Sequence, residues 1–348
     1  MNFNRRHFIK AASSLTLAST VPSLAWAAGS CDKDLVVGTW GGDYQRLLQQ
    51  NLDPLVKPEG INVVYDVGAA LQRQTKLRAE RGARRSTMDI VLLRDNDMYQ
   101  MAHENTLSPL DEAALPNLQH VIPSLKTEYA IPHIFSALVL VYNTEFLKTA
   151  PESFASLLDA SLKGKVGVVD DQYDYLTLAG ALASGKPGDD LQAGQDFLLA
   201  LRENAPKVYP SVDALASALK SGEIWVTMTW KARALQWSKA ALPVAYVFPK
   251  EGALPATFCA GLSGGSKNAA CAARYLNSML EPKAQLAFAE AMGYAPTVLN
   301  AQLPPSLQDS VGFDSAQLDL LVPVNFELLM QNKSRLLDFW NRQFRAGL

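Results

Sequence analysis

Apolar runs alternate with helical patterns over the first hundred residues. The run DLVVGTWGG (34–42) predicts a strand that ends in a glycine turn, and apolar positions follow it at helical spacing: Leu47, Leu48, Leu52 and Leu55. Two further strands are expected at INVVYDVG (61–68) and MDIVLLRDND (88–97), separated by a basic helix at LQRQTKLRAERGARR (71–85). Strands and helices in this order predict a parallel sheet with helices on both faces.

The pattern changes after residue 130. IPHIFSALVLVYNTEFL (131–147) is an extended apolar run, longer than one ordinary strand. Strand–turn–helix then returns in KVGVVDDQYDYLTLAGALASG (165–185), and strands are expected within EIWVTMTW (223–230) and LPVAYVFPKEG (242–252). Helical patterns close the chain. We therefore expect two α/β halves joined by extended segments, with the chain crossing between them more than once.

The first 27 residues have the parts of a secretory signal. Arg5 and Arg6 precede an apolar stretch at 11–21, and small residues flank Trp26 at a cleavage-site pattern. The paired arginines resemble the twin-arginine export motif, and the apolar stretch is too short to span about 30 Å of hydrocarbon. We predict a twin-arginine signal peptide at 1–27 and a periplasmic mature protein. Lipidation at Cys31 is an alternative, although the leucine of a lipobox is missing.

Composition narrows the class of protein. About 320 residues remain after the signal, which favours two domains. With 48% apolar and 19% charged residues the chain is typical of a globular protein, and a net charge of −2 without a basic block argues against nucleic acid as a partner. The three cysteines allow one internal disulfide, and Cys259–Cys271 is one possibility in an oxidising compartment. Four histidines, one of them in the signal, give little support for a metal site.

Candidate chemistry gathers at the ends of predicted strands. No phosphate-binding loop, dinucleotide fingerprint, nucleophile elbow or zinc-protease motif is present. Ligands of α/β sheets bind beyond the carboxyl ends of the strands, and four such ends carry notable residues: Trp40, 95–97, 170–174 and Trp230. An aromatic wall with acids around it suits a cation.

Here the chain resembles a known family, the periplasmic solute-binding proteins of bacterial ABC importers, in particular the spermidine/putrescine-binding branch. The resemblance covers essentially the whole mature chain and depends on seven stretches in order: GTWGG, MDIVLL, IPHIFSALVLVYNTEFL, KVGVVDDQYDYLTLAGAL, SGEIWVTMTW, VFPKEGAL and EAMGYAPT. It implies the type II periplasmic binding protein fold, two α/β lobes joined by extended hinge segments. Lobe 1 would comprise 28–138 plus 252–297 and lobe 2 would comprise 139–251, with C-terminal helices at 298–348 packing on lobe 2.

The resemblance also implies a site. It places Trp40 and Trp230 at aromatic positions, Asp171 and Asp174 at acids that bind amino groups, and Tyr294 and Glu327 near the far end of the cleft. The chain departs from the polyamine binders in several places: Ala256 and Phe258 for a Trp and an Asp, Asn96 and Asp97 for a tyrosine, and Lys231 and Arg233 for small neutral residues. The expected ligand-binding set is Trp40, Asn96, Asp97, Asp171, Asp174, Trp230, Lys231, Phe258, Tyr294 and Glu327.

Relative to the polyamine binders, the predicted site has one acidic residue fewer and two basic residues more. This difference argues against a simple long diamine or triamine as the ligand. We expect a monomeric receptor, without cofactor or catalytic activity, that closes its lobes on a shorter or zwitterionic amine and delivers it to an ABC permease. Two alternatives remain open: a ferric-iron or thiamine receptor of the same fold, and a periplasmic enzyme that uses Asp171 and Asp174.

Overall fold

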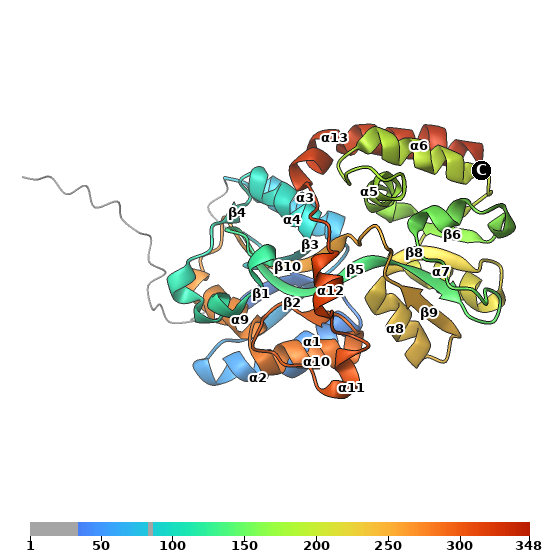
Figure 1. Ribbon diagram of the computed structural model, residues 1–348. Coiled ribbons are helices and arrows are strands. Elements are labelled where there is room, and N and C mark those ends of the chain that lie inside the picture. The colour runs from blue at the N-terminus through green and yellow to red at the C-terminus, as the bar shows by residue number, and fades with distance from the viewer. Residues whose placement is uncertain (1–33, 83–85) are drawn as a thin grey trace, which may run out of the picture.

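The computed structural model describes residues 34–82 and 86–348 (Figure 1). The predicted signal peptide at 1–27 and the alternative of lipidation at Cys31 lie outside these residues. Among the described helices, none is both long enough and apolar enough to cross a membrane.

The first lobe is built on a mixed sheet in which the predicted strands of the N-terminal third lie side by side. β1 lies between β2 and β3 and is parallel to both. β10 then pairs with β3 in the antiparallel sense, and two short strands complete the sheet. The bounds are β1 Leu35–Thr39, β2 Val63–Val67, β3 Ile90–Arg94, β4 Leu107–Ser108, β10 Pro255–Ser263 and β11 Ala295–Pro296.

The second lobe has a sheet of its own. β6 lies between β7 and β8 and is parallel to both, while β9 pairs with β5 beyond the first lobe. The bounds are β6 Val166–Val169, β7 Lys207–Tyr209, β8 Val226–Trp230 and β9 Val244–Val247.

One long strand, β5 (Ile131–Asn143), joins the two sheets, and Figure 1 shows it running across the middle of the molecule. All of its residues except Tyr142 are buried, which explains why the sequence shows a continuous apolar run rather than an alternating one. Its pairing changes partner at one point: Ala137 lies opposite Pro255 of β10, and Leu138 lies opposite Trp230 of β8. The lobe boundaries given above stay a prediction about which parts move together.

Helices cover both sheets. The first lobe carries α1 Asp43–Asn51, α2 Asp53–Val56, α3 Ala70–Glu80, α4 Asp95–His103, α9 Ala269–Met279 and α10 Pro282–Met292. The second lobe carries α5 Tyr173–Ala183, α6 Leu191–Arg202, α7 Val212–Ser221 and α8 Lys231–Lys239. The C-terminal segment adds α11 Pro305–Gln308, α12 Ser315–Asp319 and α13 Phe326–Phe339.

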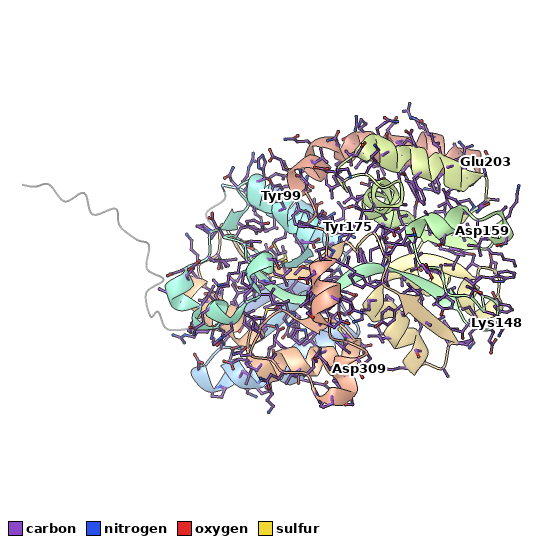
Figure 2. The ribbon with its side chains drawn as sticks, in the orientation of Figure 1. Tyr99, Lys148, Asp159, Tyr175, Glu203 and Asp309 are labelled. Atoms are coloured by element: carbon purple, nitrogen blue, oxygen red, sulfur yellow. The ribbon has the colours of Figure 1, made fainter. Side chains whose placement is uncertain are left out.

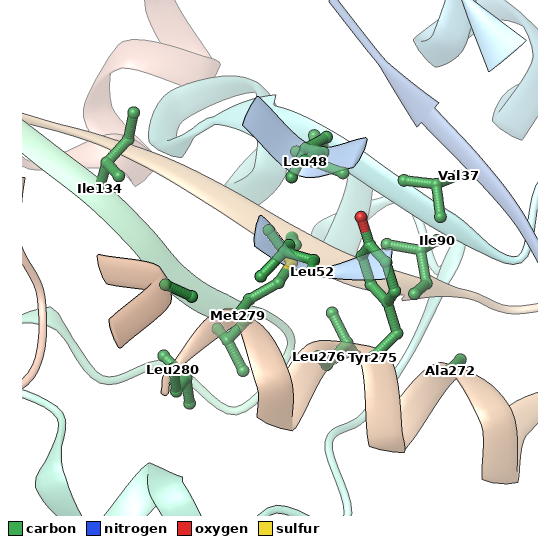
Figure 3. Close-up of a cluster of buried hydrophobic side chains, with 14 of the residues drawn as sticks. Val37, Leu48, Leu52, Ile90, Ile134, Ala272, Tyr275, Leu276, Met279 and Leu280 are labelled. Atoms are coloured by element: carbon green, nitrogen blue, oxygen red, sulfur yellow. The ribbon is translucent and has the colours of Figure 1, made fainter. Parts of the chain in front are cut away.

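Each lobe encloses its own hydrophobic core. In the first lobe, Leu48 of α1, Ile90 of β3 and Tyr275 of α9 meet in one buried cluster (Figure 3). In the second lobe, Tyr175 of α5 packs in a cluster with Leu140 of β5. Separate cores allow the two lobes to move as units.

The lobes approach closely where α10 ends. Gly293 terminates this helix with φ 71°, a left-handed conformation that favours glycine. A Cβ atom here would lie 3.3 Å from Cβ of Leu235 on α8 and 3.4 Å from the carbonyl oxygen of Ala232. Because this position carries no side chain, the end of a first-lobe helix can contact a second-lobe helix directly.

The C-terminal segment, whose helices the sequence predicts to pack on lobe 2, contacts both lobes. Val298, at its start, forms a bridge with Val121 of the first lobe. α13 buries Leu336 and Phe339 in the core of the second lobe, but Lys333 on the same helix donates to Gln100 of α4 at 2.9 Å. The helix therefore ties the lobes together.

The cysteines differ from the pairing considered above. Cys259 is a free thiol buried in the first lobe, and burial raises its pKa well above the ordinary value. Cys271 is disulfide-bonded, so its partner is not Cys259. A Cys259–Cys271 bond is therefore wrong, because the two cysteines lie on different elements, β10 and α9, in different hydrophobic clusters.

Candidate binding site between the lobes

A cavity of about 660 Å³ lies between the two lobes, and we call it the open cavity. The first lobe contributes the residues just after β1, the start of α1, β5, β10, the last turn of α10 and Tyr294 beyond it, and the second lobe contributes α7 and α8. Its lining consists of Trp40, Gly41, Asp43, Tyr44, Ile134, Asp213, Arg233, Gln236, Lys239, Phe258, Ala291, Met292 and Tyr294. This volume is in the range of pockets that enclose a small molecule.

The first-lobe wall of the open cavity is aromatic. Trp40 follows β1, and its ring meets Phe258 of β10 edge-on, with centroids 5.4 Å apart. Phe258 in turn meets Tyr294 edge-on at 5.2 Å, and Tyr44 of α1 lies 5.2 Å from Trp40. Edge-to-face contacts of this kind fix the rings in place, so the wall presents a preformed surface for an apolar or cationic group.

Arg73 holds the base of that wall. Its guanidinium lies 4.5 Å from the centre of the Trp40 ring, and it donates to the carbonyl oxygens of Thr39, Gly68 and Leu92 at 2.6 to 2.9 Å. Burial lowers the pKa of Arg73 to about 10, which leaves it charged at neutral pH. This arginine from α3 therefore links the ends of β1 and β3 and supports Trp40 from behind.

A neutral histidine lies beneath the same wall. His133 of β5 is buried, its Nδ1 is 2.7 Å from the hydroxyl of Tyr44, and its ring lies edge-on to Phe288 at 4.5 Å. Burial lowers the pKa of His133 to about 3. The imidazole is thus uncharged at neutral pH and belongs to the support of Tyr44.

The second-lobe wall is basic. Nη1 of Arg233 donates to Gln236 at 2.8 Å, while its Nε is buried without a hydrogen-bond partner. Arg233 is also close enough to oppose the rise that burial causes in the pKa of Tyr294. Lys239, at the end of α8, donates to the carbonyl oxygen of Glu290 at 2.8 Å. Arg233 and Lys239 thus place two cationic side chains on the second-lobe side of the cavity.

Arg233 reaches the cavity because of how α8 begins. β8 ends at Trp230 and the helix starts at the next residue, where the backbone N–H of Ala232 donates to Oγ of Ser136 on β5 at 3.1 Å. Residues two apart on a helix point about 200° apart, so Lys231 and Arg233 face opposite ways.

A second group of charged and aromatic residues crosses between the lobes, and we call it the filled site. Arg94, the last residue of β3, forms an ion pair with Asp174 of α5 at 3.1 Å. Asn96 closes the triangle, because it accepts from Nε of Arg94 at 3.1 Å and donates to Asp174 at 2.8 Å. The guanidinium also lies 5.0 Å from the ring centre of Tyr175 and 5.9 Å from that of Trp230.

Asp95 adds a further link across the lobes. Its carboxylate accepts from the backbone N–H of Thr257 at 2.6 Å and from the hydroxyl of Tyr175 at 3.2 Å. Figure 2 labels Tyr175 at the boundary between the lobes. Burial raises the pKa of Asp95 to about 6, against the opposing effect of Arg94 and of these hydrogen bonds.

The structure divides the sequence-predicted residues into two groups and leaves four apart. Trp40, Phe258 and Tyr294 line the open cavity together. Asn96, Asp174 and Trp230 surround Arg94 at the filled site, where Trp230 is only 5% exposed and lies edge-on to Tyr175 at 5.1 Å. The other four residues are Asp97, Asp171, Lys231 and Glu327, and none of them lines the open cavity.

Each of these four has another environment. Asp97 lies 3.7 Å from Lys333 of α13. Asp171 is exposed. Glu327 is exposed in the first turn of α13 and accepts from Gln331 at 3.1 Å. These three acids lie outside the open cavity, and their part in ligand binding stays a prediction.

Lys231 differs most from its expectation. Its ammonium is buried, donates to the carbonyl oxygens of Gly312 and Val311, and lies 4.3 Å from the ring centre of Phe313. Burial lowers its pKa to about 8. This lysine anchors the C-terminal segment, because the helix turn directs it away from the face that carries Arg233.

Sequence reasoning missed several cavity residues. Tyr44 lies in the first turn of the helix that follows the strand end at Trp40, so it could have been found from its place beside that strand end. Gln236 lies three positions after Arg233 on α8, so the two share one helix face. The one feature of the sequence that points to Arg94 is its position next to the acidic residues at 95–97. Its ion pair with Asp174 joins two distant segments and can be seen only in the tertiary structure.

No resident metal centre is formed by the usual donor side chains in the part of the chain that the structure describes. Among these residues no three His, Cys, Asp or Glu side chains come together as a ligand set.

Two α/β lobes, joined by a shared strand and enclosing a cavity of small-molecule size, define the class of type II periplasmic binding proteins. The family model described as bacterial extracellular solute-binding protein matches residues 53–314, and the chain belongs to this family. The resemblance noted from the sequence is thereby confirmed.

The similar proteins align with most of the chain, but their sequence identity to it is low. Spermidine/putrescine-binding periplasmic protein 1 of Haemophilus influenzae is 25% identical over 77% of this chain and 78% of its own. The gamma-aminobutyric acid-binding protein of Pseudomonas aeruginosa is 23% identical over 92% of this chain and 93% of its own. A crystal structure of the spermidine/putrescine ABC transporter substrate-binding protein of Streptococcus pneumoniae superposes with a TM-score of 0.76 at 23% identity, covering 90% of this chain and 99% of that one.

Proposed function

We propose that this chain is the solute receptor of an ABC importer and that it captures a small zwitterionic amine, a solute with an ammonium and a carboxylate group, in the open cavity. The observation that carries the proposal is the pairing of two unlike walls: aromatic rings from one lobe and the cationic side chains of Arg233 and Lys239 from the other. The relatives named for polyamines and for gamma-aminobutyric acid support an amine as the common element of the ligand.

The carboxylate would bind at the basic wall. An arginine gives the carboxylate directed, charge-assisted hydrogen bonds, and removal of water from the closing cleft strengthens them. The nearby Lys239 adds positive charge at the mouth of the cavity.

The ammonium would bind at the aromatic wall. Rings such as those of Trp40 and Phe258 attract a cation by about 0.5 to 2 kcal/mol each, depending on desolvation. The acids that line the same cavity, Asp43 and Asp213, are exposed and lie one on each lobe, so they attract the cation without being buried. The ligand then touches both lobes only when they are closed, and this shifts the population to the closed form.

The proposal also includes the delivery of the solute to a permease and the location of the receptor in the cell. The closed receptor would dock on an ABC permease as a monomer in the periplasm, after export directed by residues 1–27, and it would not transform its ligand. A ferric-iron or thiamine ligand, or catalysis by Asp171 and Asp174, is not favoured by the relatives. Asp174 is also held by Arg94, while Asp171 is exposed and away from the open cavity.

Calorimetric titration of the mature chain tests the proposal. The probes are 4-aminobutyrate, 1,4-diaminobutane and spermidine, so that the first two share a four-carbon backbone and differ in the carboxylate. We expect saturable one-to-one binding of 4-aminobutyrate and at least tenfold weaker binding of the diamine. Equal affinity for both, or no response to any aminocarboxylate in a wider panel, would overturn the proposal.

A further inference from the structure

We propose that Arg94 is a built-in cation: it occupies a site between the lobes that would otherwise accept an external ammonium or guanidinium group, and so limits the receptor to solutes short enough for the open cavity. The inference deepens the proposed function, because it identifies the residue that sets the length of the ligand.

The surroundings of Arg94 have the composition of a cation site. One carboxylate, Asp174, pairs with the guanidinium at 3.1 Å, and the amide of Asn96 bonds to both partners. The rings of Tyr175 and Trp230 lie 5.0 and 5.9 Å from the guanidinium carbon. A carboxylate, an amide and two ring faces around one positive charge are what a protein uses to hold a cationic ligand.

The site is largely shielded from solvent. The side chains of Arg94 and Asp174 are 18% and 12% exposed. Burial acts to lower the pKa of Arg94, but the carboxylates, first that of Asp174, outweigh it and raise the pKa above the ordinary value. The guanidinium is therefore charged at neutral pH, and the charge of Asp174 is already paired.

Neighbours of Arg94 line two spaces of very different size. In the sheet Arg94 is directly opposite Phe258, which lines the open cavity. On its other side, Asn96 and Asp174 line a space of only about 20 Å³ against α13, room for about one water molecule. A solute that extends from the open cavity toward α13 would have to displace the guanidinium from its ion pair.

The experiment removes the built-in cation and offers a free one. The variants are Arg94→Ala, the double variant Arg94→Ala/Asp174→Asn, Arg94→Lys, and, as a matched control, Arg342→Ala. The control removes an arginine from the exposed pair with Asp338, whose charged atoms are 2.7 Å apart. The probe is methylguanidinium chloride at millimolar concentration, compared with sodium chloride at the same concentration, and the readout is the thermal unfolding midpoint Tm.

We expect methylguanidinium to raise the Tm of Arg94→Ala in a saturable manner. It should leave the wild type, the Arg94→Lys variant, the double variant and the Arg342→Ala control unchanged. In calorimetry, Arg94→Ala should bind spermidine at least tenfold more tightly than the wild type does, because the long amine can now reach Asp174. Should Arg94→Ala fail to fold, Arg94→Gln keeps an amide in place and takes the same two measurements.

A Tm of Arg94→Ala or Arg94→Gln that ignores methylguanidinium, or responds equally without Asp174, would overturn the inference. The methylguanidinium measurement does not depend on the natural solute. If the wild type binds no aminocarboxylate, the proposed function fails while this measurement still decides the role of Arg94. If 4-aminobutyrate binds and spermidine gains nothing in Arg94→Ala, the inference fails alone.

Discussion

The open cavity and the filled site both consist of aromatic and charged side chains. They differ in whether the charged group is paired with another residue of the chain. Both combine rings from one side with a charged group from the other, and both span the lobes. At the open cavity Arg233 keeps a buried Nε without a partner beside a space of about 660 Å³. At the filled site Asp174 is satisfied by Arg94, and the adjoining space is about 20 Å³. A receptor of this fold can thus accept a different class of solute when one of its own residues, here Arg94, supplies a charge that a bound solute would otherwise supply.

The largest expected effect comes from breaking the filled site. Asp174→Asn leaves the guanidinium of Arg94 buried without a carboxylate, and removing one partner of a buried ion pair costs about 3 kcal/mol of unfolding free energy. Urea denaturation monitored by circular dichroism measures it. The matched control is Asp338→Asn, in an exposed pair with Arg342, where the loss should stay below about 0.5 kcal/mol.

A double replacement sharpens this result. In Arg94→Met/Asp174→Leu both charges are absent and apolar side chains fill the space, so most of the loss should be recovered. A double variant as unstable as Asp174→Asn would mean that packing, and not charge pairing, sets the stability of the region.

The next effect concerns the open cavity. Arg233→Gln removes the charge that faces the solute, and loss of a charge-assisted contact in a closed site lowers affinity by about 30- to 100-fold, equivalent to about 2 to 3 kcal/mol. The unfolding free energy should change by only about 1 kcal/mol, because the variant loses one hydrogen bond, from Nη1 to Gln236. Titration with 4-aminobutyrate measures the change, with Lys186→Gln, at an exposed loop position, as the control.

The sequence predicts much of this comparison. The order of strands and helices, the long central strand at 131–147 and the placing of ligand groups at strand ends all follow from local periodicity and the rule for α/β sheets. In the structure Trp40 directly follows β1, and Asp174 lies in the first turn of α5, shortly after β6. Phe258, a predicted departure from the polyamine binders, lines the open cavity.

What the sequence could not provide is how side chains pair between distant segments. Asp174 and Trp230 are residue types that a ligand site uses. Only the structure shows that Arg94, 80 residues before Asp174 in the sequence, occupies the place of a ligand beside them. Lys231 and Arg233 are equivalent in composition and differ only in the direction that α8 gives them. Disulfide pairing has the same limit, because the oxidising compartment makes a bond between Cys259 and Cys271 possible without saying whether the two cysteines are close.

Acid should weaken the support of the open cavity. Burial lowers the pKa of His133 from its ordinary value of 6.5 to about 3, so its contribution to stability is present above pH 6.5 and is lost as the pH falls. At pH 5 this loss amounts to about 2 kcal/mol relative to pH 7. His133→Gln cannot take up the proton, and its unfolding free energy should therefore fall less between pH 7 and pH 5 than that of the wild type. Parallel curves for the two proteins would contradict the assignment.

The filled site should respond to acid in the opposite direction and by less. Burial raises the pKa of Asp95 to about 6, so its contribution is present below the ordinary pKa near 3.8 and is lost as the pH rises through 6. Between pH 5 and pH 7 the change is about 1 kcal/mol. Asp95→Asn has no titrating carboxyl group at this position. The difference in unfolding free energy between wild type and variant should therefore shrink by about 1 kcal/mol as the pH rises from 5 to 7. A difference that instead grows over this range would place the negative charge of Asp95 among the stabilising groups of the site, with Arg94 as the cation that keeps it ionised.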